Sequence, residues 1–202
     1  MEFDLTGKDY ERAYSLLASL VCPRPIAWVT SMNENSTINA APFSFFNVVG
    51  DSPPMVMFCP GDREDGTPKD TARNIRRSGE FVVNLIDETL AESMVRTSAA
   101  LPYGVSEVDA ENLMTTPSRS IAVPRITAAA AALECVLHEI LEIGQNRIVL
   151  GIVKRIQVKD EFVNPSSMRI KGFYPLGRMA SPDWYCRTNE PFEIVRPRWN
   201  RG

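Results

Sequence analysis

The sequence predicts a mainly β protein with short helices, whose antiparallel strands close into a barrel. About six or seven stretches have strand character, against three or four short helical ones. The two longest strand stretches, residues 133–143 and 147–159, follow each other as a hairpin instead of alternating with helices. No GxGxxG motif follows the first strand, so a Rossmann dinucleotide site has no support.

Size and composition predict one domain over residues 1–202, with a C-terminal arm from about residue 191. Of the 202 residues, 44% are hydrophobic and 23% are charged, which allows a sizeable core. The net charge of -3 provides no basic field of the kind that nucleic-acid binding needs. No apolar run approaches the roughly 20 residues of a membrane span, and the acidic first ten residues are not a signal peptide. We therefore expect neither a nucleic-acid nor a membrane partner.

The cysteine and histidine content argues against metal and disulfide chemistry. The four cysteines show no CxxC spacing, so neither a zinc site nor a disulfide framework is expected. The single histidine, His138, excludes a His-rich metal site and has no nucleophile motif beside it. Reduced cysteines and the lack of a targeting segment favour the cytoplasm. The cysteines are Cys22, Cys59, Cys135 and Cys186.

The first part of the chain is predicted to hold one helix and then closely spaced strands. An amphipathic pattern predicts the helix over residues 8–20. Pro23 and Pro25 end it, because proline forces an extended chain. Apolar runs separated by polar turns predict the strands, and the run after Pro42 is either a strand or a strand with an irregular backbone. The expected strands are residues 26–30, 37–41, 43–49 and 55–59.

A second helix is expected to end two residues before Gly79, which serves as its left-handed cap. Its start is open, because either Thr67 or Asp70 can be the N-cap. Both starts place Lys69 and Thr71 at the N-terminus of the helix. The charged, Gly- and Pro-containing stretch before it is expected to be a loop.

The rest of the chain is predicted to be a strand, a short helix, an irregular stretch and the long hairpin. Alternating apolar residues predict a strand over 80–86, and a helix begins at residue 87 or 89 and runs to 97. Residues 99–120 are the least regular part, with one polar stretch compatible with a helix. Local propensity assigns the alanine run 128–132 to a helix, but we expect the neighbouring strand to override it. Residues 144–146 join the two hairpin strands.

Two polar segments offer the chemistry that a phosphorylated flavin needs. Lys69, Thr71 and the free amides of their helix suit a phosphate, because a helix N-terminus favours anions. The alternative is a capped surface helix with an exposed lysine. Residues 39–47 place asparagine and serine among phenylalanines and small residues, which leaves room for a flat ring against the backbone. The alternative is a core strand with a bulge.

Other polar and aromatic residues have weaker functional interpretations. Arg24 is held extended between two prolines and faces either the ligand phosphate or a surface carboxylate. Trp28 and Trp184 are expected in the core. Three arginines form a cluster that fits a solvated helix face or one anionic ligand, with a nucleotide substrate as the weaker option. They are Arg73, Arg76 and Arg77.

Taken in order, several segments resemble the flavin reductase-like family. They are residues 23–31 (PRPIAWVTS), 39–47 (NAAPFSFFN), 69–75 (KDTARNI) and 174–179 (YPLGRM). The resemblance extends from about residue 14 to 197. It implies a split β-barrel of antiparallel Greek-key type, a homodimer, and FMN bound near the dimer interface. Residues 128–131 and 179–182 depart from the family pattern, which leaves the second substrate open.

Position by position, the resemblance implies three groups of cofactor-binding residues. Those lining the ring and ribityl chain are Asn39, Ala41, Pro42, Ser44, Phe45 and Asn47. Those toward the phosphate are Thr30, Ser31, Lys69 and Thr71. Those approaching from the far side or from the partner subunit are Tyr174, Gly177 and Arg178. Together with Arg24, Phe43 and Asp70, these are the candidate site residues, and no catalytic side chain or metal ligand is expected.

The first functional hypothesis is an FMN-binding oxidoreductase of flavin reductase type. It would pass electrons from NAD(P)H, or another donor, through bound flavin to a small-molecule or flavin acceptor. The alternative is a non-catalytic FMN-binding protein or electron carrier, which stays open because no nicotinamide-binding motif is visible. A dimeric barrel without flavin is the third hypothesis. FAD is not firmly excluded, although the sequence shows no adenine site.

Overall fold

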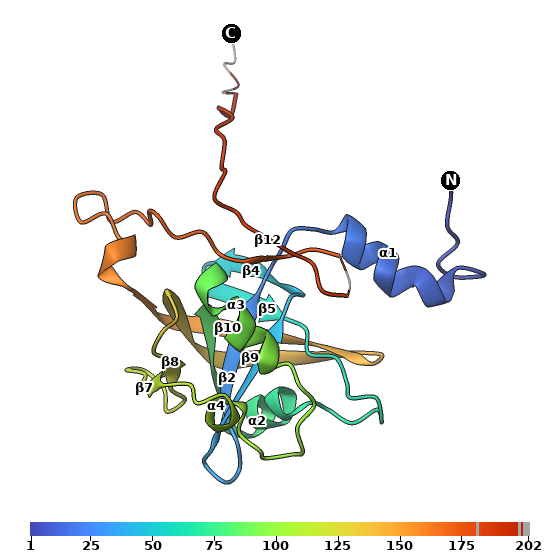
Figure 1. The fold of residues 1–202 in the computed structure, drawn as a ribbon, viewed down its shortest axis with the longest axis horizontal. Coiled ribbons are helices and arrows are strands. Elements are labelled where there is room, and N and C mark those ends of the chain that lie inside the picture. Colours follow the sequence, from blue (N-terminus) through green and yellow to red (C-terminus); the bar gives the residue numbers. More distant parts are fainter. Residues whose placement is uncertain (181, 198, 200–202) are drawn as a thin grey trace.

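The computed structural model describes residues 1–180, 182–197 and 199, and its centre is a seven-stranded sheet (Figure 1). The strands lie in the order β3-β2-β6-β9-β10-β5-β4, and all neighbours are antiparallel. This confirms the expected mainly β, antiparallel architecture. The strands are β2 (Ala27–Met32), β3 (Ile38–Phe43), β4 (Phe46–Asp51), β5 (Pro54–Phe58), β6 (Glu80–Leu85), β9 (Ala131–Ile143) and β10 (Asn146–Val158).

The two edge strands of this sheet are joined by a corner of only two residues. β3 ends at Phe43, β4 begins at Phe46, and Ser44 and Phe45 connect them. Three Cα–Cα steps span at most about 11 Å, so the opposite edges of the sheet must approach each other here. The sheet therefore curls toward a barrel. The predicted strand over 43–49 is interrupted at this corner, which agrees with the irregular backbone that was its alternative.

A close approach in β10 supports the curl. The pairing register of β10 with β9 shifts between Leu150 and Gly151, and such bulges increase the local twist of a sheet. A Cβ atom at Gly151 would lie 2.3 Å from Cζ of Phe81. Glycine at this position therefore lets the Phe81 ring lie directly against the strand.

Apolar side chains cover both faces of β2. Ala27 and Val29 belong to the core cluster inside the curl, together with Phe58 and other residues of the sheet. Trp28 points to the opposite face, because successive side chains of a strand alternate. There it joins a second cluster that includes Met94. β2 is consequently the best buried strand, with both faces covered.

The helices are short and surround the sheet (Figure 1). α2 packs against β2 and β3, whereas α3 and α4 pack against β3. The helices are α1 (Ala13–Leu20), α2 (Asp70–Ser78), α3 (Ala91–Arg96) and α4 (Glu107–Ala110), with 3-10 turns η1 (Tyr10–Arg12), η2 (Glu88–Leu90) and η3 (Asp160–Phe162). None of the described helices is long and apolar enough to cross a membrane.

Two small sheets complete the fold. One has the order β1-β11-β12, and the other pairs β7 with β8. Their strands are β1 (Arg24–Pro25), β7 (Thr115–Thr116), β8 (Arg125–Ile126), β11 (Gly177–Arg178) and β12 (Tyr185–Cys186). The first of these sheets holds the chain that leads to the C-terminus against the segment that follows α1.

The start of α2 differs from both predicted starts. The helix begins at Asp70, and its N-cap residue is Lys69, whose side chain makes no cap hydrogen bond. The Thr67 hydroxyl instead donates to Asp65 at 2.5 Å. The Asp70 carboxylate is paired with Arg63. Both expected caps are thus engaged with the preceding loop, while Gly79 is the left-handed C-cap as predicted.

The other predicted elements are largely confirmed. Asp87 caps the expected helix near residues 88–96 by accepting a hydrogen bond from the amide of Thr89. Within the irregular stretch 99–120, α4 is the polar helical segment. Of the alanine run, Ala131 and Ala132 belong to β9, while residues 128–130 precede it as a loop.

The helix near the N-terminus and the C-terminal segment are largely exposed and lie outside the core. In Figure 1, α1 projects from one side of the sheet and the C-terminal segment runs away from it. Ala18 is the buried residue of α1, whereas Leu17 and Leu20 are exposed. Phe192 is also exposed, as expected for an arm. The remaining part of that predicted arm, residues 198 and 200–202, lies outside the described residues.

Candidate functional site

A cavity of about 520 Å³ opens between β3, the N-terminus of α2 and two loops, and we call it the β3–α2 cavity. Its volume lies in the usual range of ligand sites. The loops are residues 62–65 and 97–101. Seven of the sequence-predicted residues line it: Asn39, Ala41, Pro42, Phe43, Lys69, Asp70 and Thr71.

One end of the cavity is cationic and lies at the start of α2. Among the described residues, no side chain caps this helix, so its first amides keep their donors. Lys69 lies exposed beside them, yet desolvation of its ammonium group lowers the pKa of that group, with a smaller contribution from the Arg63 charge. A helix N-terminus with an adjacent cation is a suitable place for a phosphate.

A buried hydrogen-bond network fixes the polar residues at this end. The Asn39 side-chain amide donates to the Thr71 hydroxyl at 2.9 Å and to the Ser31 hydroxyl at 3.2 Å. The Asn74 amide donates to the same Ser31 hydroxyl at 3.1 Å. The network connects β2, β3 and α2, so it sets the position of the helix N-terminus relative to the sheet. Ser31 therefore acts at the site through Asn39, without lining the cavity.

The wall of the cavity is formed by the end of β3. Ala41 and Pro42 present small or rigid surfaces, and Phe43 lies below Lys69, whose Nζ is 5.9 Å from the ring centroid. β3 is an edge strand, so the missing amide proton of Pro42 leaves no gap inside the sheet. A flat ring can approach this backbone more closely than it could approach branched side chains.

Five carboxyl groups line the cavity, and two of them, Asp70 and Glu107, are buried. Asp70 is paired with Arg63 at 3.2 Å, and Glu107 accepts a hydrogen bond from the amide of Ala40 at 3.1 Å. Burial raises the pKa of both carboxyl groups, and the opposing effects of Arg63 and of hydrogen bonds are smaller. An ionised carboxylate would repel a phosphate bound nearby. The groups that pair with Asp70 and Glu107 therefore affect ligand binding.

Two loops that the sequence does not predict as part of the site close the cavity. Arg63 donates to the carbonyl of Leu101 at 3.2 Å, which ties one loop to the other. The Trp28 indole donates to the Thr97 hydroxyl at 2.9 Å and anchors the second loop on the core. Residues 97–101 carry no local motif. Arg63 lies in a loop with several other charged residues, so the sequence does not distinguish it from them. Only contacts between distant segments reveal their place.

A second group of predicted residues gathers around Arg24, away from the β3–α2 cavity. Its guanidinium donates to the carbonyls of Val21 and Met179, each at 2.8 Å, and to that of Ala18 at 2.5 Å. It also donates to the Ser44 hydroxyl at 3.4 Å. Arg24 thus joins the end of α1, the β3–β4 corner and the C-terminal segment. Phe45, Gly177 and Arg178 belong to the same region.

The remaining predicted residues lie elsewhere. Thr30 faces away from α2, because it neighbours Ser31 on the strand, and its hydroxyl donates to the carbonyl of Pro124 at 2.8 Å. Asn47 is exposed on β4, where its side chain accepts a hydrogen bond from the next amide. Tyr174 is exposed ahead of β11. In one chain, these three residues do not reach the β3–α2 cavity.

Most of the sequence matches the model of a known family. The model of the family described as "Flavin reductase like domain" matches residues 19–176, which include β1 to β10 and the whole β3–α2 cavity. The chain belongs to the flavin reductase-like family. The resemblance that the sequence segments carry is therefore confirmed, and the family membership indicates a flavin cofactor.

Solved structures support this membership. A 2-nitrobenzoate 2-nitroreductase (NbaA) of Pseudomonas fluorescens is 35% identical, with a TM-score of 0.88 over 98% of this chain and 96% of that one. The nitrilotriacetate monooxygenase component B of Bacillus cereus is 31% identical, with a TM-score of 0.90 over 96% and 98%. A putative flavin reductase with a split barrel domain from Shewanella frigidimarina is 16% identical, with a TM-score of 0.80 over 98% and 100%. The last likeness identifies the curled sheet as a split barrel.

The raised pKa of Glu107 predicts a pH-dependent cost to stability. When the pKa of a buried carboxyl is raised above its ordinary value of 4.5, the folded protein binds that proton more tightly than the unfolded protein does. The protein therefore loses stability as pH rises from 4.5 through the raised pKa. Glu107→Gln keeps an acceptor for the Ala40 amide and has no charge to bury. We expect the variant to gain stability relative to the wild type across this window, in urea unfolding from pH 4 to pH 8. Glu161→Gln, at an exposed position, is the control, and a pH-independent difference for Glu107→Gln would contradict the prediction.

Proposed function

We propose that this chain is an FMN-dependent oxidoreductase of the flavin reductase type. It takes electrons from NAD(P)H and passes them through bound flavin to a small-molecule or flavin acceptor. The observation that carries the proposal is the contrast between the two ends of the β3–α2 cavity. A cationic end at the uncapped N-terminus of α2 suits a phosphate, and the small-residue wall of β3 suits a flat ring.

The residues present fit FMN in chemical type. Lys69, Thr71 and the first amides of α2 would hold the phosphate, and Asn39 orients the Thr71 hydroxyl. Ala41 and Pro42 would border the ring. Bound flavin supplies the redox chemistry, whereas the protein supplies position and electrostatics. Consistent with this division, the proposal needs no side chain as a general acid or base.

The remaining features of the cavity would hold the cofactor and limit water. The loop over residues 97–101, anchored by the Trp28–Thr97 hydrogen bond, lines the cavity. Arg63 neutralises Asp70, which reduces repulsion between that carboxylate and a bound phosphate. The names of the Pseudomonas fluorescens and Bacillus cereus structures, a nitroreductase and a monooxygenase component, support redox chemistry for this chain.

The proposal is tested by an anaerobic absorbance titration of the FMN-loaded protein with NADH and then NADPH. We expect the flavin bands to bleach with at least one of the two nicotinamides and to return when oxygen is admitted. Bands that respond to dithionite but to neither nicotinamide would instead identify an electron carrier. Failure to bind FMN would overturn the cofactor assignment itself.

Lys69 provides a test of the phosphate end. Lys69→Met removes a cation from the cavity and is expected to weaken FMN binding about tenfold, since a charged hydrogen bond contributes about 1.5–3 kcal/mol. Riboflavin has no phosphate, so its affinity should change less than about twofold. Both affinities can be measured by quenching of flavin fluorescence. The exposed Lys171→Met is the matched control, and an equal loss for riboflavin would mean that Lys69 does not face the phosphate.

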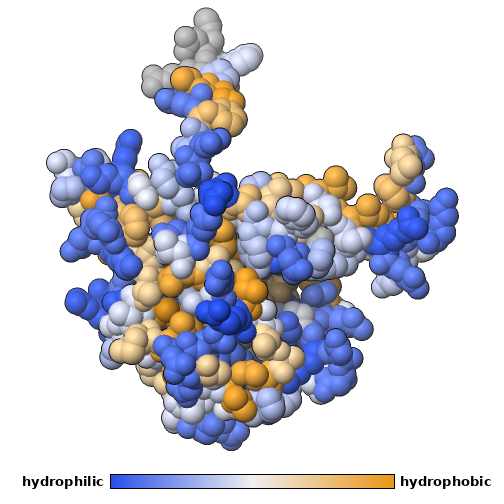
Figure 2. Space-filling model, viewed as in Figure 1, coloured by the Kyte–Doolittle hydropathy of each residue, from blue (hydrophilic) through white to orange (hydrophobic). Residues whose placement is uncertain are grey.

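We also propose a homodimer built on α1 and the β3–β4 corner. Exposed apolar side chains gather there, and Figure 2 shows orange surface on the part that projects at α1. The rings of Tyr14 and Phe45 are 6.5 Å apart, so the helix and the corner form one continuous surface. An apolar patch of this kind marks an interface. Its exposed members are Tyr14, Leu17, Leu20, Phe45, Val48 and Val49.

Leu17 tests the dimer. A carboxylate in a desolvated apolar interface is costly, so Leu17→Glu should convert a dimer to a monomer in size-exclusion chromatography with light scattering. Ser15 lies on the same helix and hydrogen-bonds the carbonyl of Arg12, away from the apolar face. Ser15→Glu is therefore expected to remain dimeric. A monomeric wild type would exclude the proposed assembly.

A further inference from the structure

A separate pocket lies at the open end of the β9–β10 hairpin, and we call it the hairpin-base pocket. Its volume is about 440 Å³, within the range of small-molecule sites. It is bordered by the segment around β7 and β8, the start of β9 and the end of β10. None of its lining residues belongs to the β3–α2 cavity, and β7 and β8 lie apart from α2 in Figure 1. A ligand bound here would therefore not compete with flavin for the same residues.

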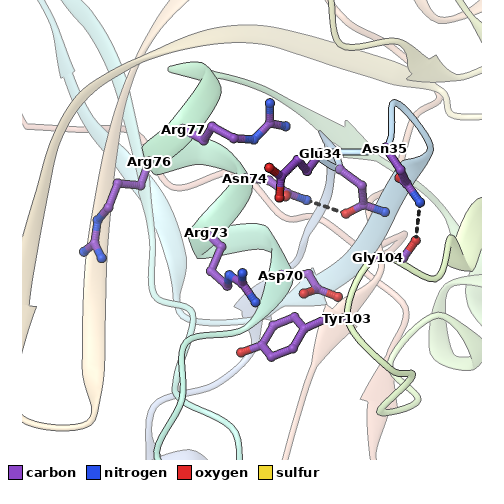
Figure 3. Close-up of a pocket in the computed structure, with 10 residues that line it drawn as sticks. Glu34, Asn35, Asp70, Arg73, Asn74, Arg76, Arg77, Tyr103 and Gly104 are labelled. Atoms are coloured by element: carbon purple, nitrogen blue, oxygen red, sulfur yellow. Dashed lines mark hydrogen bonds between the residues drawn. The ribbon is translucent and has the colours of Figure 1, made fainter.

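Four cationic side chains line the hairpin-base pocket and, among the described residues, no carboxylate does. None of the four forms an ion pair within that part of the chain. The pocket beside α2 is different, because the carboxylates of Glu34 and Asp70 lie among its arginines (Figure 3). The uncompensated cations repel each other, although the chain as a whole has a net charge of -3. The four are Arg119, Arg125, Arg155 and Lys159.

Arg125 contributes a buried donor without a partner. Its Nε is buried and makes no hydrogen bond within the part of the chain that the structure describes. Arg147 also has such an Nε, but its guanidinium is paired with Asp62. A buried charged donor that stays unpaired is costly. Because Arg125 lines the pocket, an acceptor on a ligand can supply the missing partner.

Neutral partners hold two of the other cations at the pocket. The Arg155 Nε donates to the Ser120 hydroxyl at 2.9 Å, and the Lys159 ammonium group donates to the carbonyl of Ala128 at 3.0 Å. These bonds restrain the two side chains without neutralising their charge. A side chain that is already restrained loses less conformational entropy when a ligand binds. The two cations are thus prepared for an anion.

The buried Glu134 of β9 orders the loop that carries Arg119. Its carboxylate accepts hydrogen bonds from the amides of Arg119 at 2.9 Å and Ser120 at 2.7 Å, and from the side chain of Gln157. Both carboxylate oxygens therefore have neutral donors, so this acid fixes the loop instead of pairing with a guanidinium group. At the start of β9, residues 129–132 are alanines, whose short side chains leave the pocket open.

We propose that the hairpin-base pocket binds the phosphate group of a small molecule, held by its four cations. A phosphate monoester carries a charge of about −1.5 to −2 at pH 7 and presents three oxygen acceptors. The cations come from two separate parts of the chain, residues 119–125 and 155–159, so they border the pocket on more than one side. Phosphate oxygens accept hydrogen bonds in several directions, whereas the oxygens of a carboxylate lie in one plane. Charge and geometry together favour a phosphate.

The test is isothermal titration calorimetry of the full chain in a phosphate-free, low-salt buffer, with inorganic phosphate and glycerol 3-phosphate as probes. We expect saturable binding that Arg125→Gln and Arg155→Gln each weaken about tenfold, because each removes a charged hydrogen bond. Arg155 is exposed, so its variant tests the inference even if Arg125→Gln does not fold. Arg169→Gln removes the same charge from an exposed position outside the pocket, and its affinity should change less than about twofold.

Several outcomes would overturn the inference. They are the absence of saturable binding, an equal loss of affinity in Arg169→Gln, and binding of succinate, a dicarboxylate, as tightly as phosphate. Binding that is lost in Lys69→Met but kept in Arg125→Gln and Arg155→Gln would place the ion in the β3–α2 cavity and would also overturn it. With the expected variant effects, tighter binding of glycerol 3-phosphate supports a phosphorylated metabolite, and tighter binding of inorganic phosphate supports the free ion. The test requires no flavin, so its failure leaves the proposed function intact.

Discussion

The arrangement of this protein depends on the two-residue corner between its edge strands. Because β3 and β4 lie at opposite edges of one sheet but are joined by only Ser44 and Phe45, the sheet cannot stay open. It curls and encloses an apolar core. The end of β3 that leads into the corner is also the wall of the β3–α2 cavity. The same constraint therefore closes the barrel and places a small-residue backbone segment where a flat ring can lie.

The second determinant is the polar network that positions α2 on the sheet. Ser31 is one residue from Thr30, yet their side chains face opposite sides of β2, and only Ser31 meets Asn39 and Asn74. Buried polar groups that are fully paired specify one arrangement, because any shift leaves a donor unsatisfied. The network thus fixes the N-terminus of α2, with its Lys69 and unpaired amides, at the edge of the cavity.

Cationic side chains occur along α2 from its start to its last turn. At its start, Lys69 and the amides face the β3–α2 cavity, and desolvation already lowers the pKa of the lysine. Arg63 and Arg73 flank the Tyr103 ring, and Arg73 and Arg77 line a second pocket beside α2. One short helix therefore offers cations along most of its length while the protein as a whole is acidic. Local charge, not net charge, decides which ligand such a surface attracts.

Most of the strands, the long hairpin, the cap of α2 at Gly79 and the family can be predicted from the residues alone, since alternation, turn chemistry and short motifs are local properties. The sequence also identifies the part of the site that lies within two short segments, residues 39–43 and 69–71. The loops that close the cavity and the role of Arg24, whose guanidinium joins α1 to Met179, become visible only in the folded chain. A second pocket beside α2 likewise combines residues 33–35 and 103–104 with five residues of the helix, which are Asp70, Arg73, Asn74, Arg76 and Arg77. These features depend on contacts between residues far apart in the chain, which no local pattern encodes.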